Sequence, residues 1–262
     1  MYDYHLHSWY SHDSQADPRI IAEQAARSGL REICFTEHVE FDENGAGVPR
    51  IQMEEYTACI EELRRNSDIT IRQGVEIGLR DSDTFAQAYN FIKDYPIDFI
   101  IGSVHWTDEG DAYFPPFFEG RDKETAYRRY LELAFPRCVS SAQYQVFGHF
   151  DYPAKKAPYE DRAMYYEMAP DVFDRLFRHF IQNGIGIEIN TSVYRTKEEK
   201  MWGLDILKRY VQLGGEYITV GSDAHVPERI GWRINDAIEL ARQAGIRYLA
   251  TFHRQKPVFH RI

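Results

Sequence analysis

The stretch DYHLHSWYSHDSQADPRIIAEQAARSG, residues 3–29, holds a short strand pattern followed by a helix pattern. His5 and His7 stand two residues apart, so on a β-strand both imidazoles project from the same face. The helix that follows has Asp17 as its predicted N-cap, a proline at its first position and a glycine at its end. Two adjacent imidazoles are costly to bury unless a metal ion shares their lone pairs. The stretch therefore indicates a βα unit whose strand ends in candidate metal ligands.

The same alternation of strand and helix continues to the end of the chain. Further strands are expected at 32–38, 69–78, 98–106, 145–152, 185–190 and 217–225, with a closing strand-like piece at 248–252. Helices are expected at 17–29, 54–66, 82–94, 123–142, 170–184, 198–215 and 228–245. Repeated βα units predict a parallel sheet wrapped by helices, which seven or eight units close into a barrel. No linker or change of composition interrupts the pattern, so we predict one α/β domain over residues 1–262.

An open, doubly wound sheet is the competing architecture for this pattern. The first βα turn lacks the GxGxxG motif that usually accompanies a dinucleotide-binding sheet. The barrel is therefore the favoured prediction.

The bulk composition is that of an ordinary enzyme, with 44% hydrophobic and 27% charged residues. A formal net charge of −10 argues against nucleic acid as the main partner. Three cysteines without close spacing predict neither a disulfide framework nor a zinc knuckle. No signal peptide pattern is found, and no apolar run approaches the roughly 18 residues of a membrane span. We expect a cytoplasmic protein without a membrane partner, and the sequence does not predict its oligomeric state.

The predicted strands end in side chains that bind metals. In a parallel barrel the carboxyl ends of all strands share one face, where active sites are built. Six of the ten histidines stand at these strand ends, with carboxylates nearby. The nine candidate ligands are His5, His7, Asp13, His38, Glu76, His105, His149, Asp223 and His225. One ion uses three or four ligands, so this set implies two or three ions, and ligation without thiolates suits Zn, Mn or Fe without choosing among them.

Several of these residues have ordinary interpretations when each is taken alone. His105 or His149 could be a hydrogen-bonded core residue, and Glu76 could be a structural acceptor. Glu37 precedes His38 and points to the opposite face, so it is expected to support the site from behind or to face solvent. Three further histidines are expected outside the cluster: His179, His253 and His260.

The strand-end motifs, taken together, resemble a known family. In chain order HLH, TEH, GVE, SVH, GHFD and SDAH are similar to the motifs of the polymerase-and-histidinol-phosphatase (PHP) family, over essentially the whole chain. SHDS, ICFTEH, FGHFDYPAK, EINTS, GSDAH and FFEGRDKETAYRRYL are similar to its histidinol-phosphate phosphatase branch. The resemblance implies a distorted, TIM-like (β/α)7 barrel with a trinuclear metal site. It also implies a phosphomonoesterase that hydrolyses L-histidinol phosphate in histidine biosynthesis.

Carried over by motif, the resemblance assigns the ligands to three ions. The first ion would take His5, His7, Glu76 and Asp223. The second would take Glu76, His105 and His149, and the third Asp13, His38 and His225. Some family members have histidine at the Asp13 position, and His12 is adjacent here, but the spacing from His7 favours Asp13.

The expected chemistry follows from a pair of ions bridged by Glu76. Such a pair would lower the pKa of a shared water towards neutrality and provide a hydroxide for in-line attack on phosphorus. Phosphoryl transfer otherwise needs mainly positioning and electrostatic stabilisation from the protein. Asp223 or His225 is the candidate to carry the proton to the leaving alkoxide.

Basic residues follow the fifth and sixth predicted strands and are the candidate phosphate contacts: Lys155, Lys156, Arg162 and Arg195. Family relatives are similar in placing an arginine in each of these loops, whereas the fifth-strand loop here offers lysines, which act as point charges. These residues could also be ordinary solvated loop charges. The loop residues that could bind the amine and imidazole of histidinol are Glu40, Asp42, Trp106 and Phe118, and the sequence does not rank them.

Other functions are compatible with part of this pattern. A hydrolase of the same family could act on nucleotides, oligonucleotides or phosphotyrosine. A non-catalytic, metal-binding regulatory barrel would be expected to have lost ligands, and all nine are present. A metal-dependent amidohydrolase shares the barrel and the HxH opening, but normally has a bridging Lys or Glu late on the fourth strand, where this chain has SVH.

Overall fold

The computed structural model describes residues 1–41, 51–141 and 143–262, so Asp42 lies outside the described residues. The first half of the chain forms β1 Tyr2–Leu6, α1 Pro18–Arg27, β2 Glu32–Val39, α2 Met53–Asn66, β3 Thr70–Gly78, α3 Ser82–Ile92 and β4 Phe99–Ser103. The second half forms α4 Lys123–Ser140, β7 Val146–Phe147, α5 Pro170–Gln182, β8 Gly186–Asn190, α6 Leu204–Gln212, β9 Tyr217–Gly221 and α7 Ile234–Ala244. Strand and helix therefore alternate as the sequence predicts.

The loops after the strands carry shorter elements. A small antiparallel pair, β5 Trp106–Thr107 and β6 Gly110–Asp111, follows β4. Single 3-10 turns are η1 Pro115–Phe118, η2 Tyr152–Lys155, η3 Tyr166–Met168 and η4 Pro227–Arg229. The chain ends in β10 Tyr248–His253 and β11 Lys256–Arg261. None of the described helices is both long enough and apolar enough to cross a membrane.

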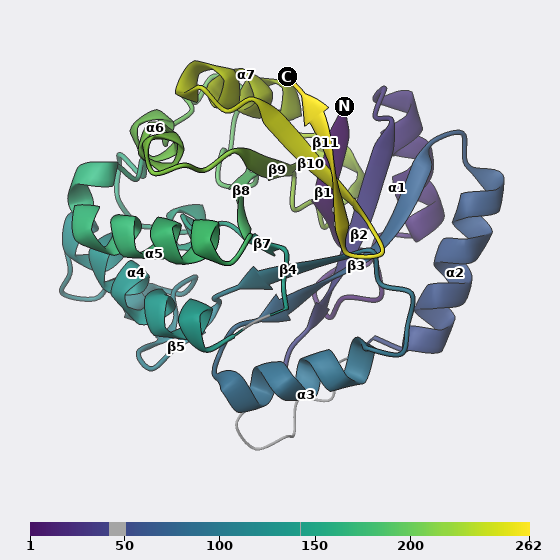
Figure 1. Cartoon of the computed structure of the whole chain (residues 1–262), viewed down its shortest axis with the longest axis horizontal. Helices are drawn as coiled ribbons and strands as arrows, with labels where there is room; N and C mark the ends of the chain where they lie inside the picture. Colours follow the sequence, from purple (N-terminus) through teal and green to yellow (C-terminus); the bar gives the residue numbers. More distant parts are fainter. Residues whose placement is uncertain (42–50, 142) are drawn as a thin grey trace.

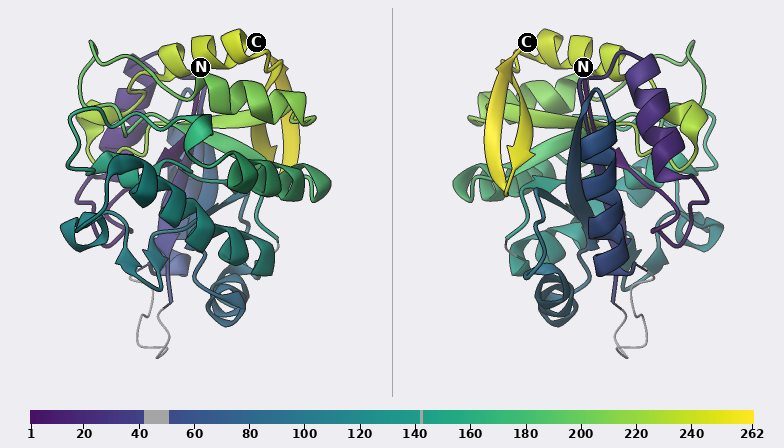
Figure 2. Two further views of the ribbon diagram at one scale, coloured as in Figure 1. Left: turned by 90° about the vertical axis from the view of Figure 1, so that its left-hand side faces the viewer. Right: turned by 90° about the vertical axis from the view of Figure 1, so that its right-hand side faces the viewer.

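The parallel strands form a ring with the helices outside it (Figures 1 and 2). Neighbours run in the order β1-β2-β3-β4-β7-β8-β9, and every pair in this series is parallel. The first and last of these strands also meet. The amide of Asp223 donates to the carbonyl of His5 at 2.7 Å, and the amide of His7 donates to that of Ala224 at 3.0 Å. The observed architecture agrees with the predicted α/β fold built on seven βα units.

The ring is distorted at its amino end by the C-terminal hairpin. β10 pairs in parallel with the start of β9 and antiparallel with β11. The sequence predicts β10 but not β11. The turn between them uses Arg254 and Gln255 at φ 49° and 62°, where hairpins usually have Asn-Gly. Because neither residue is a typical turn former, the hairpin gives no recognisable sequence pattern.

The helices form where the hydrophobic spacing predicts them. The apolar stripe of α2, which includes Tyr56, Ile60 and Leu63, is buried, and Asp17 caps α1 by accepting from the amide of Arg19 at 2.8 Å. Helices α6 and α7 begin about six residues later than expected. Each starts directly after a residue in the left-handed region, Gly203 for α6 and Arg233 for α7, and such a residue cannot continue a helix.

The inside of the barrel is divided between two kinds of side chain. Its amino end is filled by an apolar cluster of Tyr4, Cys34, Phe99, Ile101, Val146, Ala250 and Phe252. The register of β1 against β2 shifts between Asp3 and Leu6. Because of this bulge, consecutive residues Tyr4 and His5 both contribute to the interior, Tyr4 to the apolar cluster and His5 to the polar cluster at the carboxyl end.

Candidate metal centre

Side chains from the ends of β1, β2, β3, β4, β7 and β9 converge at the carboxyl end of the barrel. They lie in or beneath a cavity of about 850 Å³. All nine predicted ligands belong to this cluster, the deepest being His5 and His7, which are fully buried. The contacts among them are given group by group below.

Glu76 from β3 is the centre of the cluster and is 1% exposed. Its Oε2 lies 3.3 Å from His5 Nε2 and 3.1 Å from His38 Nδ1. Its Oε1 lies 2.9 Å from His149 Nε2 and 3.5 Å from His105 Nε2. The two oxygens therefore face different imidazoles, so this carboxylate would be able to hold more than one ion.

Asp223, two residues after the end of β9, lies against His5 and His7. Its Oδ1 lies 3.4 Å from His7 Nε2 and 3.7 Å from His5 Nε2. Its backbone is in the left-handed region at φ 52°, a conformation that aspartate tolerates better than most residues. The carboxylate on this backbone lies against His5 and His7.

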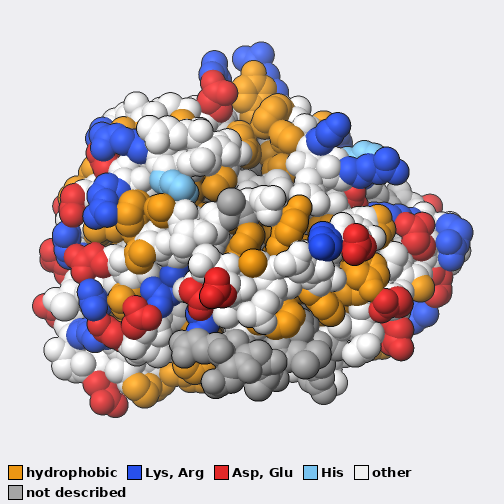
Figure 3. Space-filling model, turned by 60° about the horizontal axis from the view of Figure 1, so that its bottom comes forward, with side chains coloured by type: hydrophobic (Ala, Val, Ile, Leu, Met, Phe, Trp, Pro, Cys, Tyr) orange, Lys and Arg blue, Asp and Glu red, His pale blue; other side chains and the backbone are white. Residues whose placement is uncertain are grey.

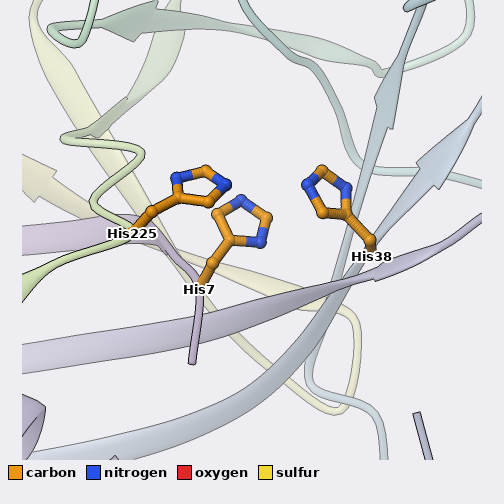
Figure 4. Close-up of side chains that lie close together, drawn as sticks. All are labelled: His7, His38 and His225. Atoms are coloured by element: carbon orange, nitrogen blue, oxygen red, sulfur yellow. The ribbon is translucent and has the colours of Figure 1, made fainter. Parts of the chain in front are cut away.

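Asp13 lies between two histidines at the mouth of the cluster. Its Oδ2 is 3.0 Å from His225 Nε2 and 3.4 Å from His38 Nε2. His7 stacks between the same two imidazoles, with ring centroids 4.3 Å from each (Figure 4). His12 also lines the cavity, with its ring 5.0 Å from that of His38. His12, Asp13 and His38 offer ligand atoms that all lie within 4.8 Å of one another, so both candidates stand beside His38.

The cluster holds buried polar atoms that make no well-oriented hydrogen bond among the described residues: His5 Nε2, His7 Nε2, His38 Nδ1 and Glu76 Oε2, the last lying 3.1–3.6 Å from the three nitrogens. A buried polar atom without a partner costs about 1–3 kcal/mol, so four in one place require an explanation. Imidazole nitrogens and carboxylate oxygens are ligands of Zn, Mn and Fe. The donor set therefore fits divalent ions.

Charges in the cluster are strongly coupled. Burial favours the neutral ring of His5, but Glu188 and the other carboxylates around it outweigh burial and raise its pKa. Burial together with the neighbouring imidazoles of His225 and His38 lowers the pKa of His7. An imidazole with a raised pKa, such as that of His5, carries a proton that offsets the charge of the neighbouring carboxylates. Binding of divalent ions would displace such protons.

Carboxylates behind the cluster orient its histidines. Glu188 Oε1 from β8 lies 2.8 Å from His5 Nδ1, and Glu188 Oε2 accepts from the amide of His149 at 3.0 Å. Glu37 is fully buried and accepts from Ser11 Oγ at 2.6 Å, and the same hydroxyl lies 3.0 Å from His7 Nδ1. Such contacts fix the ring orientation of a metal-binding histidine.

These supporting roles were only partly predictable. Glu37 is predicted either to support the site from behind or to face solvent, and its burial behind His7 agrees with the first. Glu188 and Asn190 are among the strand-end residues predicted to converge on the pocket, but Glu188 is not among the nine predicted ligands and no supporting role is predicted for it. Glu40, a candidate contact for the substrate amine, lines the cavity and also contacts His105 Nδ1.

Three of the four predicted phosphate contacts line the cavity. Lys155 Nζ pairs with Asp223 Oδ2, and Lys156 Nζ lies 5.3 Å from the ring centroid of Tyr113. Arg195 Nη2 donates to the carbonyl of Lys155 at 3.1 Å. These contacts place the cations on the wall formed by the loops after β7 and β8.

Arg162 is the predicted contact that the structure does not bring to the cavity lining. It is buried and donates to the carbonyls of Ala154 at 2.6 Å and Val193 at 3.0 Å, and it pairs with Glu199. Its guanidinium therefore ties together the loops that carry Lys155 and Arg195. Loop position alone cannot separate a cation that faces the cavity from one that lies between two loops.

Of the residues predicted to contact the amine and imidazole of histidinol, some line the cavity and others do not. Trp106 lines the cavity and is 46% exposed, whereas Phe118 is buried in the core and does not line it. The cavity also includes Asp111, which sequence reasoning missed, and Arg229. Arg229 follows His225 by four residues, so the search for cations after strands five and six would have found it if extended to strand seven.

The other histidines lie away from this cavity. His179 is half-buried on α5, and its ring lies 3.3 Å from the side-chain amide of Asn183. His260 on β11 contacts Tyr2 and Thr251, and His253 is exposed. Their predicted exclusion from the cluster agrees with these positions.

Comparison with known proteins gives a consistent result. The family model described as PHP domain matches residues 3–192. A histidinol-phosphatase from Lactococcus lactis is 33% identical over 257 residues, which cover 97% of this chain and 95% of the relative. A protein from Clostridium acetobutylicum, described as a probable histidinol-phosphatase, is 28% identical over 261 residues and covers 99% of this chain and 96% of its own. The crystal structure of histidinol phosphate phosphatase from Lactococcus lactis, complexed with zinc, L-histidinol and phosphate, matches with a TM-score of 0.88, 32% identity and 98% of both chains covered.

Proposed function

The chain belongs to the PHP family, and on this basis we propose that it is a metal-dependent phosphomonoesterase that hydrolyses L-histidinol phosphate to L-histidinol and inorganic phosphate. The observation that carries the proposal is the set of buried, unpartnered nitrogens and oxygens around Glu76. The full-length similarity to histidinol-phosphatases supports the choice of substrate. The proposal includes a place in histidine biosynthesis, in the cytoplasm.

Three divalent ions, of Zn, Mn or Fe, would be held as the motifs assign them. The first would take His5, His7, Glu76 and Asp223, the second Glu76, His105 and His149, and the third Asp13, His38 and His225. Contacts of 2.9–3.7 Å join the side chains within each group, and Glu76 Oε2 also lies 3.1 Å from His38 Nδ1, so the contacts support one continuous cluster of ligands. When bound, the ions would supply a water acidic enough to react near neutral pH, and positive charge against the phosphate oxygens.

The chain's own residues give the cavity two chemically different walls. Lys155, Lys156 and Arg195 form a cationic wall after β7 and β8, which suits the phosphate. Glu40 and Asp111, from the loops after β2 and β4, offer carboxylates together with exposed aromatic rings. A substrate with a phosphate at one end and a cationic amine and an imidazole at the other would be oriented by this polarity.

The proton for the leaving alkoxide would come through Asp223 or His225. His225 is half-buried and lines the cavity, with its Nδ1 3.6 Å from Asp223 Oδ1. Asp223 also pairs with the ammonium group of Lys155, which faces the same space. Both side chains therefore lie beside the space in which the alkoxide would leave.

A nucleic acid substrate is not favoured by the charge distribution. On the face drawn in Figure 3, basic and acidic side chains of the described residues are interspersed, and the chain carries a formal net charge of −10. A phosphate backbone is usually held by a continuous basic surface. Small nucleotides and phosphotyrosine are the competing substrates in the test that follows.

The test is phosphate release by purified protein whose metal content has been measured, with L-histidinol phosphate, a set of nucleotides and phosphotyrosine as substrates. We expect kcat/KM for L-histidinol phosphate to exceed the others by orders of magnitude. Equal values of kcat/KM for all the substrates would support the phosphatase activity but refute L-histidinol phosphate as the specific substrate. No hydrolysis of any of them by fully metal-loaded protein would refute the proposed activity.

A further inference from the structure

Arg229, at the end of η4, is a cavity residue that the metal cluster and the predicted phosphate contacts do not include. Its guanidinium carbon lies 3.8 Å from the ring centroid of Trp232, a close stacking contact. Its Nη2 donates to the carbonyl of Tyr194 at 2.9 Å. The stacking and the hydrogen bond fix the plane of the guanidinium, so little side-chain entropy is left to lose when a ligand binds.

The charge of Arg229 has no opposite charge beside it. Over residues 1–41, 51–141 and 143–262, no carboxylate lies within ion-pair distance of this guanidinium, and burial lowers its pKa. Nearby arginines differ, because Arg233 Nε pairs with Asp236 at 2.7 Å and Arg162 pairs with Glu199. A partly buried cation without a counter-charge is costly. Its position on a cavity wall indicates that an anionic ligand supplies the missing charge.

Arg229 is physically linked to the cationic wall of the cavity. Tyr194, whose carbonyl accepts from Arg229, directly precedes Arg195 in the chain. Arg195 in turn donates to the carbonyl of Lys155. The loops after β7, β8 and β9 thus each contribute a cation, and main-chain acceptors connect the three.

We propose that Arg229 binds the phosphoryl group of the substrate and the phosphate product, as a cation supplied by the loop after β9. The inference rests on the proposed function for the identity of the substrate. Within the described parts of the chain, Nη2 of Arg229 donates to Tyr194 and its other N–H groups make no hydrogen bond, so these groups of the planar fork can pair with phosphate oxygens. The wall it shares with Arg195 and Lys155 is the cationic one, which makes phosphate rather than the amine the matching end.

The test compares Arg229→Met and Arg229→Lys with Arg233→Met. Arg233 holds the same loop, through the carbonyls of Thr196 at 3.3 Å and Glu199 at 2.5 Å, but does not line the cavity. Binding of inorganic phosphate and of L-histidinol to the metal-loaded protein is measured by calorimetry, together with KM for L-histidinol phosphate. We expect Arg229→Met to weaken phosphate binding and raise KM by about tenfold to a hundredfold, with L-histidinol binding unchanged. Arg229→Lys should be intermediate, and Arg233→Met should leave phosphate affinity near that of the wild type.

Two results would overturn the inference. Unchanged phosphate affinity in Arg229→Met would show that Arg229 does not contact the phosphate. An equal loss of phosphate affinity in Arg229→Met and Arg233→Met would show that Arg229 acts only by holding the loop in place. If Arg229→Met does not fold, as judged by circular dichroism, Arg229→Lys decides by the same phosphate titration. If the wild type fails to hydrolyse L-histidinol phosphate, the proposed function fails, whereas the phosphate titration still tests Arg229.

Discussion

The two ends of the barrel are built from the same strands but satisfy their buried polar atoms in opposite ways. At the amino end, the hydroxyl of Tyr4 donates to Glu32, which also accepts from Arg72 Nε at 2.8 Å. One residue further along β1, at the carboxyl end, the Nε2 atom of His5 makes no well-oriented hydrogen bond within the described residues. Bulged strand β1 therefore contributes a satisfied residue to one end and an unsatisfied one to the other.

The apolar amino end therefore serves mainly the stability of the fold, and the carboxyl end serves metal binding and catalysis. The amino end is an apolar cluster in which Phe99 stacks on Phe252 with centroids 4.7 Å apart. The carboxyl end concentrates charges and lone pairs that cost free energy until ions bind. Substitutions at the amino end should change the free energy of unfolding, and substitutions at the carboxyl end should change metal content and rate.

The largest effect is expected at the centre of the cluster. Glu76→Gln would remove the charge that faces five imidazoles, so we expect kcat/KM to fall at least about a thousandfold and the metal content to drop. The melting temperature of the metal-free protein should not decrease. Glu62→Gln, on the exposed side of α2, is the matched control and should change neither. Full metal content and activity in Glu76→Gln would contradict the assignment of Glu76.

The next effect tests the opposite end. Phe99→Ala would leave a void in the apolar cluster, where Phe99 is fully buried, and should lower the free energy of unfolding by about 3–5 kcal/mol. The kcat of the molecules that remain folded should stay close to that of the wild type. Denaturant unfolding and activity at low temperature measure the two quantities. Phe259→Ala on β11, where the ring is 51% exposed, is the control that should cost much less. A selective loss of kcat in Phe99→Ala would show that the two ends are not independent.

A smaller effect, on metal affinity, is expected at Glu188, which contacts the predicted ligand His5. Glu188→Gln keeps the shape of the side chain but weakens its contact with His5 Nδ1, and metal affinity should fall about tenfold to a hundredfold. Activity should recover as the metal concentration is raised. Competition with a chelator measures the affinity, and unchanged affinity would remove Glu188 from the site.

The smallest effect lies on the outer helices. Arg209 and Tyr166 donate to Asp174 at 2.6 Å and 2.8 Å, and the hydrogen bond from Arg209 lowers the pKa of this carboxyl to about 2. A lowered folded-state pKa gives stability that is present above about pH 4 and is lost as the pH falls towards 2. Asp174→Asn should therefore cost less than about 1 kcal/mol at pH 7, and the difference from the wild type should vanish near pH 2. A difference that persists at pH 2 would point to lost packing instead of lost charge.

Much of the fold and of the candidate site could be predicted because both follow from local periodicity. Side chains at the ends of parallel strands share one face whatever the details of packing, so widely separated residues such as His5 and Asp223 could be grouped before the structure was known. The stripe of α2 was equally predictable, because a helix must bury one face.

The parts that could not be predicted depend on how loops meet. Arg162 and Arg195 are both loop arginines, yet only Arg195 lines the cavity, because Arg162 is held by carbonyls of two loops. Strand β11 follows a turn without Asn or Gly, and α6 begins late because Gly203 is left-handed at φ 89°. Each of these outcomes is set by tertiary contacts or backbone conformation that residue spacing does not encode.

The most direct test of the central claim is the number of divalent ions per chain, measured by elemental analysis before and after chelation and alongside hydrolysis of L-histidinol phosphate. We predict about three ions per wild-type chain, with fewer ions and a matching loss of activity after chelation, and recovery of both when metal is restored. A chain that binds no ions at its carboxyl-end cluster, or that hydrolyses the substrate equally well without them, would contradict the claim.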